Sequence, residues 1–166
     1  MTRTVPDTPP PPIAPHEETV RPEWVDYNGH MNVAYYVLVF DRAADGLFDV
    51  LGVGESYRRA QSGSIFIVES HIAYRRELRA GDLVRVETQI LGHDDKRLHG
   101  FSRMTHAASG EVSATYEFLG LHVDMGSRRA APFPAWARER ILTFAAHHAT
   151  RPWPTEAGRG IRAPAR

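Results

Sequence analysis

The stretch WVDYNGHMNVAYYVLVFDRAADGLFDVLG, Trp24–Gly52, decides how this chain of 166 residues folds. Its second half carries apolar residues at steps of three and four, the spacing of one face of an α-helix. The members of this stripe are Val33, Tyr36, Val37, Phe40, Ala44, Leu47 and Leu51. Asn32 is a good N-cap, and Gly52 is a good stop just past the end. The pattern therefore predicts one long helix over residues 33–51, buried along this stripe.

The pair Asn28-Gly29 allows a second interpretation of the start of this stretch. Asn-Gly between apolar runs is also a strong signal for a β-hairpin, in which Asp26 would be an ordinary turn residue. The helical stripe after Asn32 continues far beyond the length of a strand, which favours the helix. The hairpin remains the alternative at this point.

Proline placement predicts the boundaries of the domain. All 12 prolines lie outside residues 23–131, and a stretch so rich in proline as residues 6–15 cannot build a helix or a central strand. We therefore expect a flexible tail over residues 1–15, one domain over residues 16–146, and a C-terminal tail over residues 147–166 that docks or frays.

Strand patterns flank the predicted helix on both sides. The expected strands are Glu17 to Val25, Ser64 to Arg75, Leu83 to Leu91, Arg97 to His106 and Glu111 to Val123. Short polar turns between the last four favour an antiparallel meander. A short helical segment from Glu55 to Gln61 and a final helix of about 12 residues after Pro134 complete the pattern. The fold class is therefore α+β, with an antiparallel sheet of about five strands wrapped around one long helix. Because such a sheet has open edges, we expect at least a dimer.

Composition excludes several functional classes. Lys plus Arg is 20 and Asp plus Glu is 20, so the chain has no general attraction to nucleic acid or to an anionic membrane. The longest apolar run has eight residues, whereas a membrane span needs roughly 20. The chain has no cysteine, which excludes thiolate nucleophiles and fits a reducing cytoplasm. We expect a cytoplasmic protein without nucleic-acid or membrane partners.

Asp26 is the residue best placed for chemistry. It precedes a glycine-containing loop that leads into the N-terminus of the long helix. The first N–H groups of a helix lack internal partners and carry about half a positive charge, so they can polarise a carbonyl group. A neighbouring carboxylate can attack that carbonyl or activate a water, which suits acyl transfer without serine or cysteine. The plain alternative is that Asp26 only caps the loop.

Other catalytic signatures are missing from the sequence. There is no G-x-S-x-G, H-E-x-x-H, phosphate-cradling or dinucleotide motif. We therefore expect no catalytic metal and no cofactor.

The segment D-Y-N-G-H-M-N followed by A-Y-Y resembles the signature of hotdog-fold acyl-CoA thioesterases of the 4-hydroxybenzoyl-CoA thioesterase-like type. The positions that fit are Asp26, Gly29, His30, Asn32 and Tyr35 or Tyr36. The passage Y-R-R-E-L-R-A-G-D, residues 74–82, is similar to the strand-turn-strand passage of that family. The resemblance covers residues 17–140 and implies the hotdog fold. Three blocks, WVDYNGHMNVAYYVLVFDRAAD, DKRLHGFSRMTH and HVDMGSRRAAPFP, resemble the betainyl-CoA thioesterases of bacterial carnitine breakdown.

The resemblance implies roles for individual residues. Asp26 would be the catalytic carboxylate, acting as general base or as nucleophile. The helix start, including Val33 and Tyr35, would supply backbone donors to the thioester carbonyl. His30 would orient water or the carbonyl, unless it is a loop histidine bonded to backbone. The other loop residues with implied substrate-binding or capping roles are Asn28, Gly29 and Asn32.

A betainyl group makes a further demand, because its quaternary ammonium cannot donate a hydrogen bond. Aromatic faces are the expected partners of such a cation. The candidates near the motif are Trp24, Tyr27, Tyr35, Tyr36 and Phe40, and the strands add Phe66, Tyr74, Phe101 and Tyr116. Glu69 stands inside an apolar strand run, where it is either paired in the core or directed at the pocket.

The resemblance thus implies a thioesterase that hydrolyses a small acyl-CoA, betainyl-CoA above others, and the open edges of the sheet predict a homodimer or homotetramer. Three alternatives remain: a thioesterase for aromatic or fatty acyl-CoA, a hydratase on the same fold, and a non-catalytic acyl-CoA-binding module that tolerates loss of Asp26.

Overall fold

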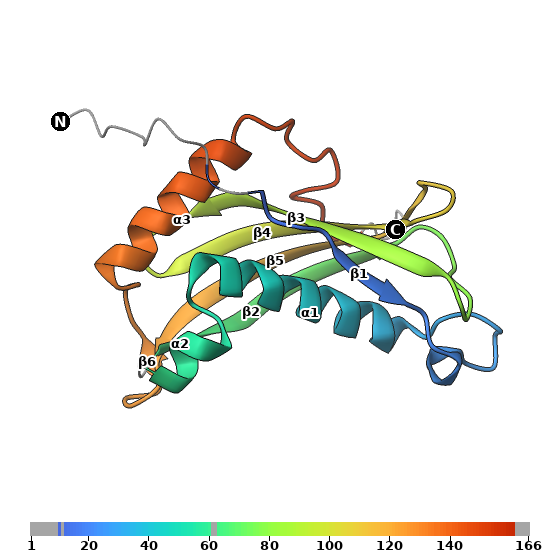
Figure 1. The fold of residues 1–166 in the computed structure, drawn as a ribbon, viewed down its shortest axis with the longest axis horizontal. Coiled ribbons are helices and arrows are strands. Elements are labelled where there is room, and N and C mark those ends of the chain that lie inside the picture. Colours follow the sequence, from blue (N-terminus) through green and yellow to red (C-terminus); the bar gives the residue numbers. More distant parts are fainter. Residues whose placement is uncertain (1–9, 11, 61–62, 162–166) are drawn as a thin grey trace, which may run out of the picture.

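A curled antiparallel sheet wraps around one long helix in the computed structural model, which describes residues 10, 12–60 and 63–161 (Figure 1). The helices are α1 (Val33–Leu51), α2 (Glu55–Ala60) and α3 (Ala135–His148), with a single 3-10 turn, η1, at Pro22–Trp24. The strands are β1 (His16–Thr19), β2 (Gly63–Tyr74), β3 (Leu83–His93), β4 (Arg97–His106), β5 (Val112–Asp124) and the two-residue β6 (Arg129–Ala130). The predicted α+β architecture is confirmed.

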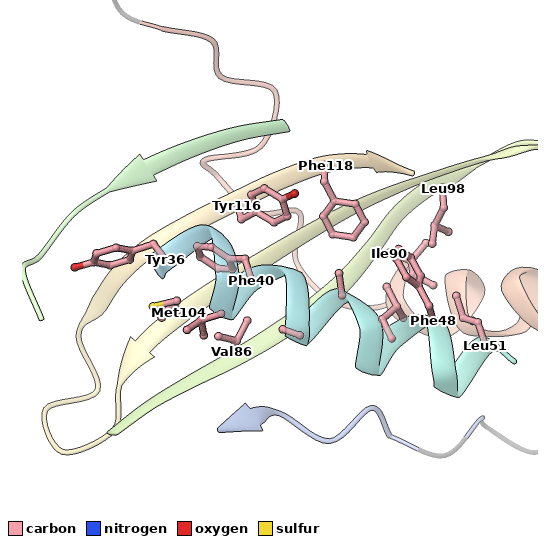
Figure 2. Packing of buried hydrophobic residues seen from close by; sticks show 14 of the residues in the cluster. Tyr36, Phe40, Phe48, Leu51, Val86, Ile90, Leu98, Met104, Tyr116 and Phe118 are labelled. Carbon is pink, nitrogen blue, oxygen red and sulfur yellow. The ribbon is translucent and has the colours of Figure 1, made fainter. Parts of the chain in front are cut away.

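Helix α1 has the bounds that the sequence predicts. The Asn32 side chain accepts a hydrogen bond from the first turn, and Gly52 ends the helix with a left-handed φ of 77°. Phe40, Leu47 and Leu51 are fully buried against the inner face of the sheet, each contributing about 1.5–3 kcal/mol of burial (Figure 2). This packing fixes the axis of α1, and with it the position of its first turn.

Two members of the predicted buried stripe are exposed instead. Val33 is 56% exposed and Val37 is 43% exposed. Both lie on the first turns of α1, on the side that the curled sheet of a single chain does not cover. The prediction that the whole stripe is buried is therefore wrong at its N-terminal end.

The order of the strands is β1-β3-β4-β5-β2, and every pairing is antiparallel. Strands β3 to β5 form the predicted meander, but β2 pairs with β5 and does not neighbour β3. The connector at residues 75–82 is too long for a tight hairpin, and Leu78 within it is fully buried. The expectation that all four strands follow one another in the sheet is therefore wrong.

The segment from Glu17 to Val25 differs from its prediction. Strand β1 ends at Thr19, and Pro22 opens a 3-10 turn after it. Proline has no N–H to donate to a neighbouring strand, so the strand stops before it.

The C-terminal part of the chain packs on the sheet. His148 is 1% exposed, and its Nδ1 accepts the N–H of Ile90 at 2.9 Å. Burial lowers the pKa of His148 to about 4, so the ring is neutral at pH 7. Farther along, the Gly158 N–H donates to Glu117 at 2.7 Å, which holds the segment across the outer face of the sheet. Of the predicted N-terminal tail, residues 1–9 and 11 lie outside the described residues.

Candidate active site

The loop before α1 is a tight, bridged turn. The Asp26 N–H donates to the His30 carbonyl at 3.1 Å, and the Gly29 N–H donates to the Asp26 carbonyl at 3.0 Å. Val25 and Met31 form an isolated antiparallel bridge across the turn. Gly29 has a φ of 80°, a value that favours glycine. The hairpin alternative therefore describes the loop itself, and the predicted helix begins directly after it.

Neighbouring segments hold this loop in place. The Asn32 N–H donates to the Trp24 carbonyl at 2.9 Å, which ties the two ends of the loop together. The Met31 N–H donates to the Leu78 carbonyl at 2.7 Å, and both of these side chains are buried. The loop is thus fastened to the 75–82 connector as well as to itself.

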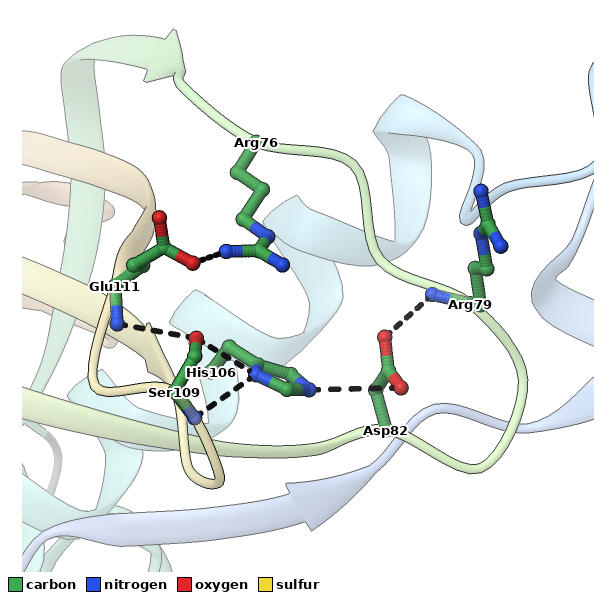
Figure 3. Close-up of polar contacts among 6 residues, drawn as sticks. All are labelled: Arg76, Arg79, Asp82, His106, Ser109 and Glu111. Carbon is green, nitrogen blue, oxygen red and sulfur yellow. Dashed lines mark hydrogen bonds and ion pairs between the residues drawn. The ribbon is translucent and has the colours of Figure 1, made fainter.

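The connector is fastened in turn by the β4–β5 hairpin (Figure 3). Arg76 pairs with Glu111, and Asp82 accepts the Arg79 N–H at 2.8 Å. His106 lies 3.5 Å from Asp82 through Nε2. Its Nδ1 lies 2.9 Å from the Ser109 hydroxyl oxygen and accepts the Ser109 N–H at 3.3 Å. The Ser109 N–H and hydroxyl both contact the same ring nitrogen, so His106 and Ser109 close the β4–β5 turn, and His106 links this turn to Asp82 of the connector.

The Asp26 carboxylate receives one donor on each oxygen. Its Oδ1 accepts the Asn28 N–H at 2.8 Å, and its Oδ2 accepts the Asn32 side-chain amide at 3.0 Å. The Asn28 backbone bond, followed by the Asn32 amide and the nearby His30, keeps the pKa of Asp26 below its usual range. The carboxylate is therefore ionised at neutral pH, as either a nucleophile or a general base requires.

One backbone donor of the first helical turn remains available. The Ala34 N–H donates to the Asn32 Oδ1 at 3.0 Å, and the Tyr35 N–H donates to the Asn32 carbonyl at 3.0 Å. Among the described residues the Val33 N–H has no hydrogen-bond acceptor. Val33 follows Asn32 directly in the chain, and the Asn32 side chain contacts both the Asp26 carboxylate and the Ala34 N–H.

His30 lies half-buried in the same turn. Its Nδ1 is 3.4 Å from the Met31 carbonyl oxygen. This contact is the backbone bond of the plain alternative, and the substrate-orienting role of His30 stays a prediction.

Four of the aromatic candidates, those in the loop and the first turn of α1, are arranged in different ways. Trp24 and Tyr35 stack with ring centroids 5.3 Å apart and planes at 12°, which leaves no room for a trimethylammonium group between them. The Arg21 guanidinium lies 5.1 Å from the Trp24 ring centroid. Tyr36 is buried, its hydroxyl donates to the Arg76 carbonyl at 3.2 Å, and burial raises its pKa to about 12. Tyr27 is 96% exposed.

The sequence offers Tyr74 as one of the strand aromatics that could contact the cation, but it does not indicate that Tyr74 lies near the loop. Tyr74 ends strand β2, is 47% exposed, and meets Tyr36 edge-to-face at 5.2 Å. Leu78 was missed as well, although it could be recognised as the one large apolar residue in a charged connector, RRELRAGD.

Glu69 is not brought to the loop within the chain. A β-bulge between Ile67 and Glu69 shifts the register, so Glu69 pairs with Leu119. Phe118, next to Leu119, contacts Phe48 of α1, so Leu119 and Glu69 face the opposite, outer side of the sheet. Glu69 is exposed there, so it is not paired in the core, and its contact with substrate stays a prediction.

Comparison with known proteins decides the family. The profile of the thioesterase-like superfamily matches residues 20–141, most of the chain. The chain belongs to the thioesterase-like superfamily. The matching region includes Asp26, the bridged turn and all of α1, and the family accounts for the predicted hotdog fold.

Individual proteins of this kind are similar to the chain in sequence or in structure. A betainyl-CoA thioesterase from Pseudomonas aeruginosa is 40% identical over 152 residues, which cover 92% of this chain and 96% of the relative. An L-carnitine dehydrogenase/betainyl-CoA thioesterase from Rhizobium meliloti is 39% identical over 86% of this chain, which spans only 28% of that longer protein. A Staphylococcus aureus protein solved in complex with CoA is 28% identical, with a TM-score of 0.86 over 95% of this chain and 98% of that one. No helix among the described residues of our chain is long and apolar enough to cross a membrane.

Proposed function

We propose that this chain is an acyl-CoA thioesterase that hydrolyses betainyl-CoA to the free acid and CoA. The observation that carries the proposal is the pairing of an ionised carboxylate with an unused backbone donor. Asp26 and the Val33 N–H are both joined to Asn32, one through its side chain and the other through the peptide bond. A thioester carbonyl accepting the Val33 N–H would therefore lie close to the carboxylate.

The chemistry follows from these two groups. The Val33 N–H and the positive end of the α1 dipole stabilise the negative charge that develops on the carbonyl oxygen. Asp26 either takes a proton from the water that attacks the carbonyl carbon, or attacks that carbon itself and is released by water afterwards. The C–S bond breaks, the CoA sulfur takes up the proton, and water supplies the oxygen of the acid. This reaction needs no cofactor.

Betainyl-CoA is the preferred substrate in this proposal because the Pseudomonas aeruginosa relative bears that activity in its name and is similar over nearly its full length. The CoA complex of the Staphylococcus aureus neighbour supports a CoA thioester as the substrate class. The space between Trp24 and Tyr35 is closed to a cation, whereas Tyr27 and Tyr74 are exposed and are candidates to contact the ammonium group.

We further propose that a second copy of the chain completes the site. Strand β2 is the end strand of the sheet, has 12 residues and exposes Phe66 and Val68. Val33 and Val37 of α1 add exposed apolar surface beside the candidate site. A long apolar edge strand left open invites pairing with another chain, and a second copy would cover these side chains.

A panel of CoA thioesters tests the function and the substrate separately. The informative pair is betainyl-CoA and 3,3-dimethylbutyryl-CoA, which has the same shape without the positive charge; acetyl-CoA and butyryl-CoA extend the panel. We expect thiol release with all four, and a kcat/KM for betainyl-CoA at least about tenfold higher than for its neutral isostere, as a desolvated cation–aromatic contact would give. Each rate is first divided by the rate of spontaneous hydroxide cleavage, because the ammonium group itself activates the thioester.

The two parts of the proposal fail in different ways. Equal corrected kcat/KM values for the charged and neutral isosteres would contradict recognition of the ammonium group. No thiol release with any of the four thioesters would contradict the thioesterase itself.

A further inference from the structure

Asn32 joins the first turn of α1 to the Asp26 carboxylate through one planar group. Its Oδ1 accepts the Ala34 N–H at 3.0 Å, and its Nδ2 donates to the Asp26 Oδ2 at 3.0 Å. The two ends of an amide are fixed relative to each other, so the capping bond at one end sets the direction in which the other end donates. A residue that only capped the helix would need the oxygen alone.

The backbone of Asn32 is itself held by a hydrogen bond, so the position of its side-chain amide is fixed. Its φ and ψ are −64° and 144°, and its N–H donates to the Trp24 carbonyl at 2.9 Å. On the other oxygen of the carboxylate, the Asn28 N–H donates at 2.8 Å. One backbone donor and one side-chain donor therefore define the plane of the Asp26 carboxylate.

We propose that Asn32 is a positioning residue: its side-chain amide orients the Asp26 carboxylate against the first turn of α1. This inference rests on the proposed function for its catalytic consequence. It gives Asn32 a task different from the substrate contact that the sequence suggests, and different from helix capping alone. Without the Nδ2 donor, the carboxylate keeps only the Asn28 bond and can rotate away from the Val33 N–H.

Two substitutions distinguish the positioning role of the Asn32 side chain from its role as the N-cap of α1. Asn32→Asp keeps a side-chain oxygen that can cap α1 and has no donor for Asp26, whereas Asn32→Ser keeps a capping oxygen whose hydroxyl ends one bond short of the Nδ2 donor that it replaces. Asn32→Asp also places a second negative charge beside Asp26, which raises the pKa of a carboxyl group. The matched control is Gly52→Ala, which disturbs the opposite end of the same helix and touches nothing in the loop.

The first measurement is the pH profile of kcat/KM for betainyl-CoA, with kcat and KM determined separately. We expect both Asn32 variants to melt close to the wild type and to lose about tenfold to a hundredfold in kcat, because small misplacements of a reacting group have effects of that size. The acid limb of the profile moves to higher pH, farther for Asn32→Asp than for Asn32→Ser. Gly52→Ala lowers the melting temperature and leaves the profile in place.

The second measurement does not depend on turnover. The Asp26 carboxyl carbon is followed by NMR during an acid titration of the wild type and both variants. A higher Asp26 pKa in both variants supports the proposal that the Asn32 amide positions the Asp26 carboxylate. An unchanged Asp26 pKa in both overturns it, and so does a kcat loss that simply follows melting temperature with no shift of the acid limb. A wild type without thiol release from any acyl-CoA overturns the proposed function instead, whatever the titration gives.

Discussion

The two ends of α1 are built for different purposes. At the C-terminal end, the Gly52 N–H donates to the Asp49 carbonyl and the Val53 N–H to the Phe48 carbonyl, so these two carbonyl groups are satisfied within the chain. Trp136 and Arg140 of α3 pack over this end so closely that a Cβ on Gly52 would meet either of them at 3.2 Å. At the N-terminal end, the cap satisfies the Ala34 and Tyr35 N–H groups but no described acceptor takes the Val33 N–H. The C-terminal end of α1 is therefore covered by packing against α3. The N-terminal end instead keeps the Val33 N–H as a donor next to Asn32, which binds the Asp26 carboxylate.

The most severe test of this contrast removes the Val33 N–H alone. Val33 is the first helical residue, where proline is tolerated because its missing N–H costs no helical bond. The extended conformation of Asn32 also suits a residue before proline. We expect Val33→Pro to fold and melt like the wild type while kcat falls by about 10² to 10³, the loss seen when one oxyanion donor is removed. The assay is thiol release from betainyl-CoA.

Val33→Ala is the matched control for that variant, because it trims the side chain and keeps the N–H. It should retain far more of the wild-type kcat than Val33→Pro does. A folded Val33→Pro enzyme with the kcat of Val33→Ala would mean that the helix start does not bind the carbonyl oxygen.

The smaller effect is expected at the other end. Gly52→Ala puts a side chain at a φ of 77° and against α3, so we expect the free energy of unfolding to fall by about 1–2 kcal/mol. Because this end contacts neither Asp26 nor Val33, kcat at a temperature where the variant is folded should stay at the wild-type value. Urea unfolding and steady-state kinetics on one preparation measure both quantities. A large kcat loss in Gly52→Ala would contradict the claim that only the N-terminal end of α1 takes part in catalysis.

The sequence predicts well those features that depend only on neighbouring residues in the chain. The bounds of α1 follow from Asn32, Gly52 and the apolar stripe, because caps and periodicity act within a few residues. The position of Asp26 before the helix start follows for the same reason.

What the sequence misses depends on pairing between distant segments. Strand β2 pairs with β5 and not with β3, the next strand in the chain, and no alternation pattern records this choice of partner. Glu69 shares the spacing of Ile65 and Ile67, yet one bulged residue turns it to the other face. The Asn32 amide contact spans six residues and exists only because the turn closes. The stacking of Trp24 on Tyr35 likewise needs the closed loop, so the set of aromatic residues free to bind a cation could be found only in three dimensions.

The central claim is that the Asp26 carboxylate performs the chemistry at the open end of α1. The most direct measurement is kcat for betainyl-CoA with purified Asp26→Asn, compared with the wild type after both are shown to have the same melting profile. Asparagine keeps the size of the side chain and an oxygen for the loop, but it is neither a base nor a nucleophile of useful strength. The account predicts a folded variant whose kcat is lower by at least about a hundredfold. A folded Asp26→Asn protein with near-normal turnover would contradict it.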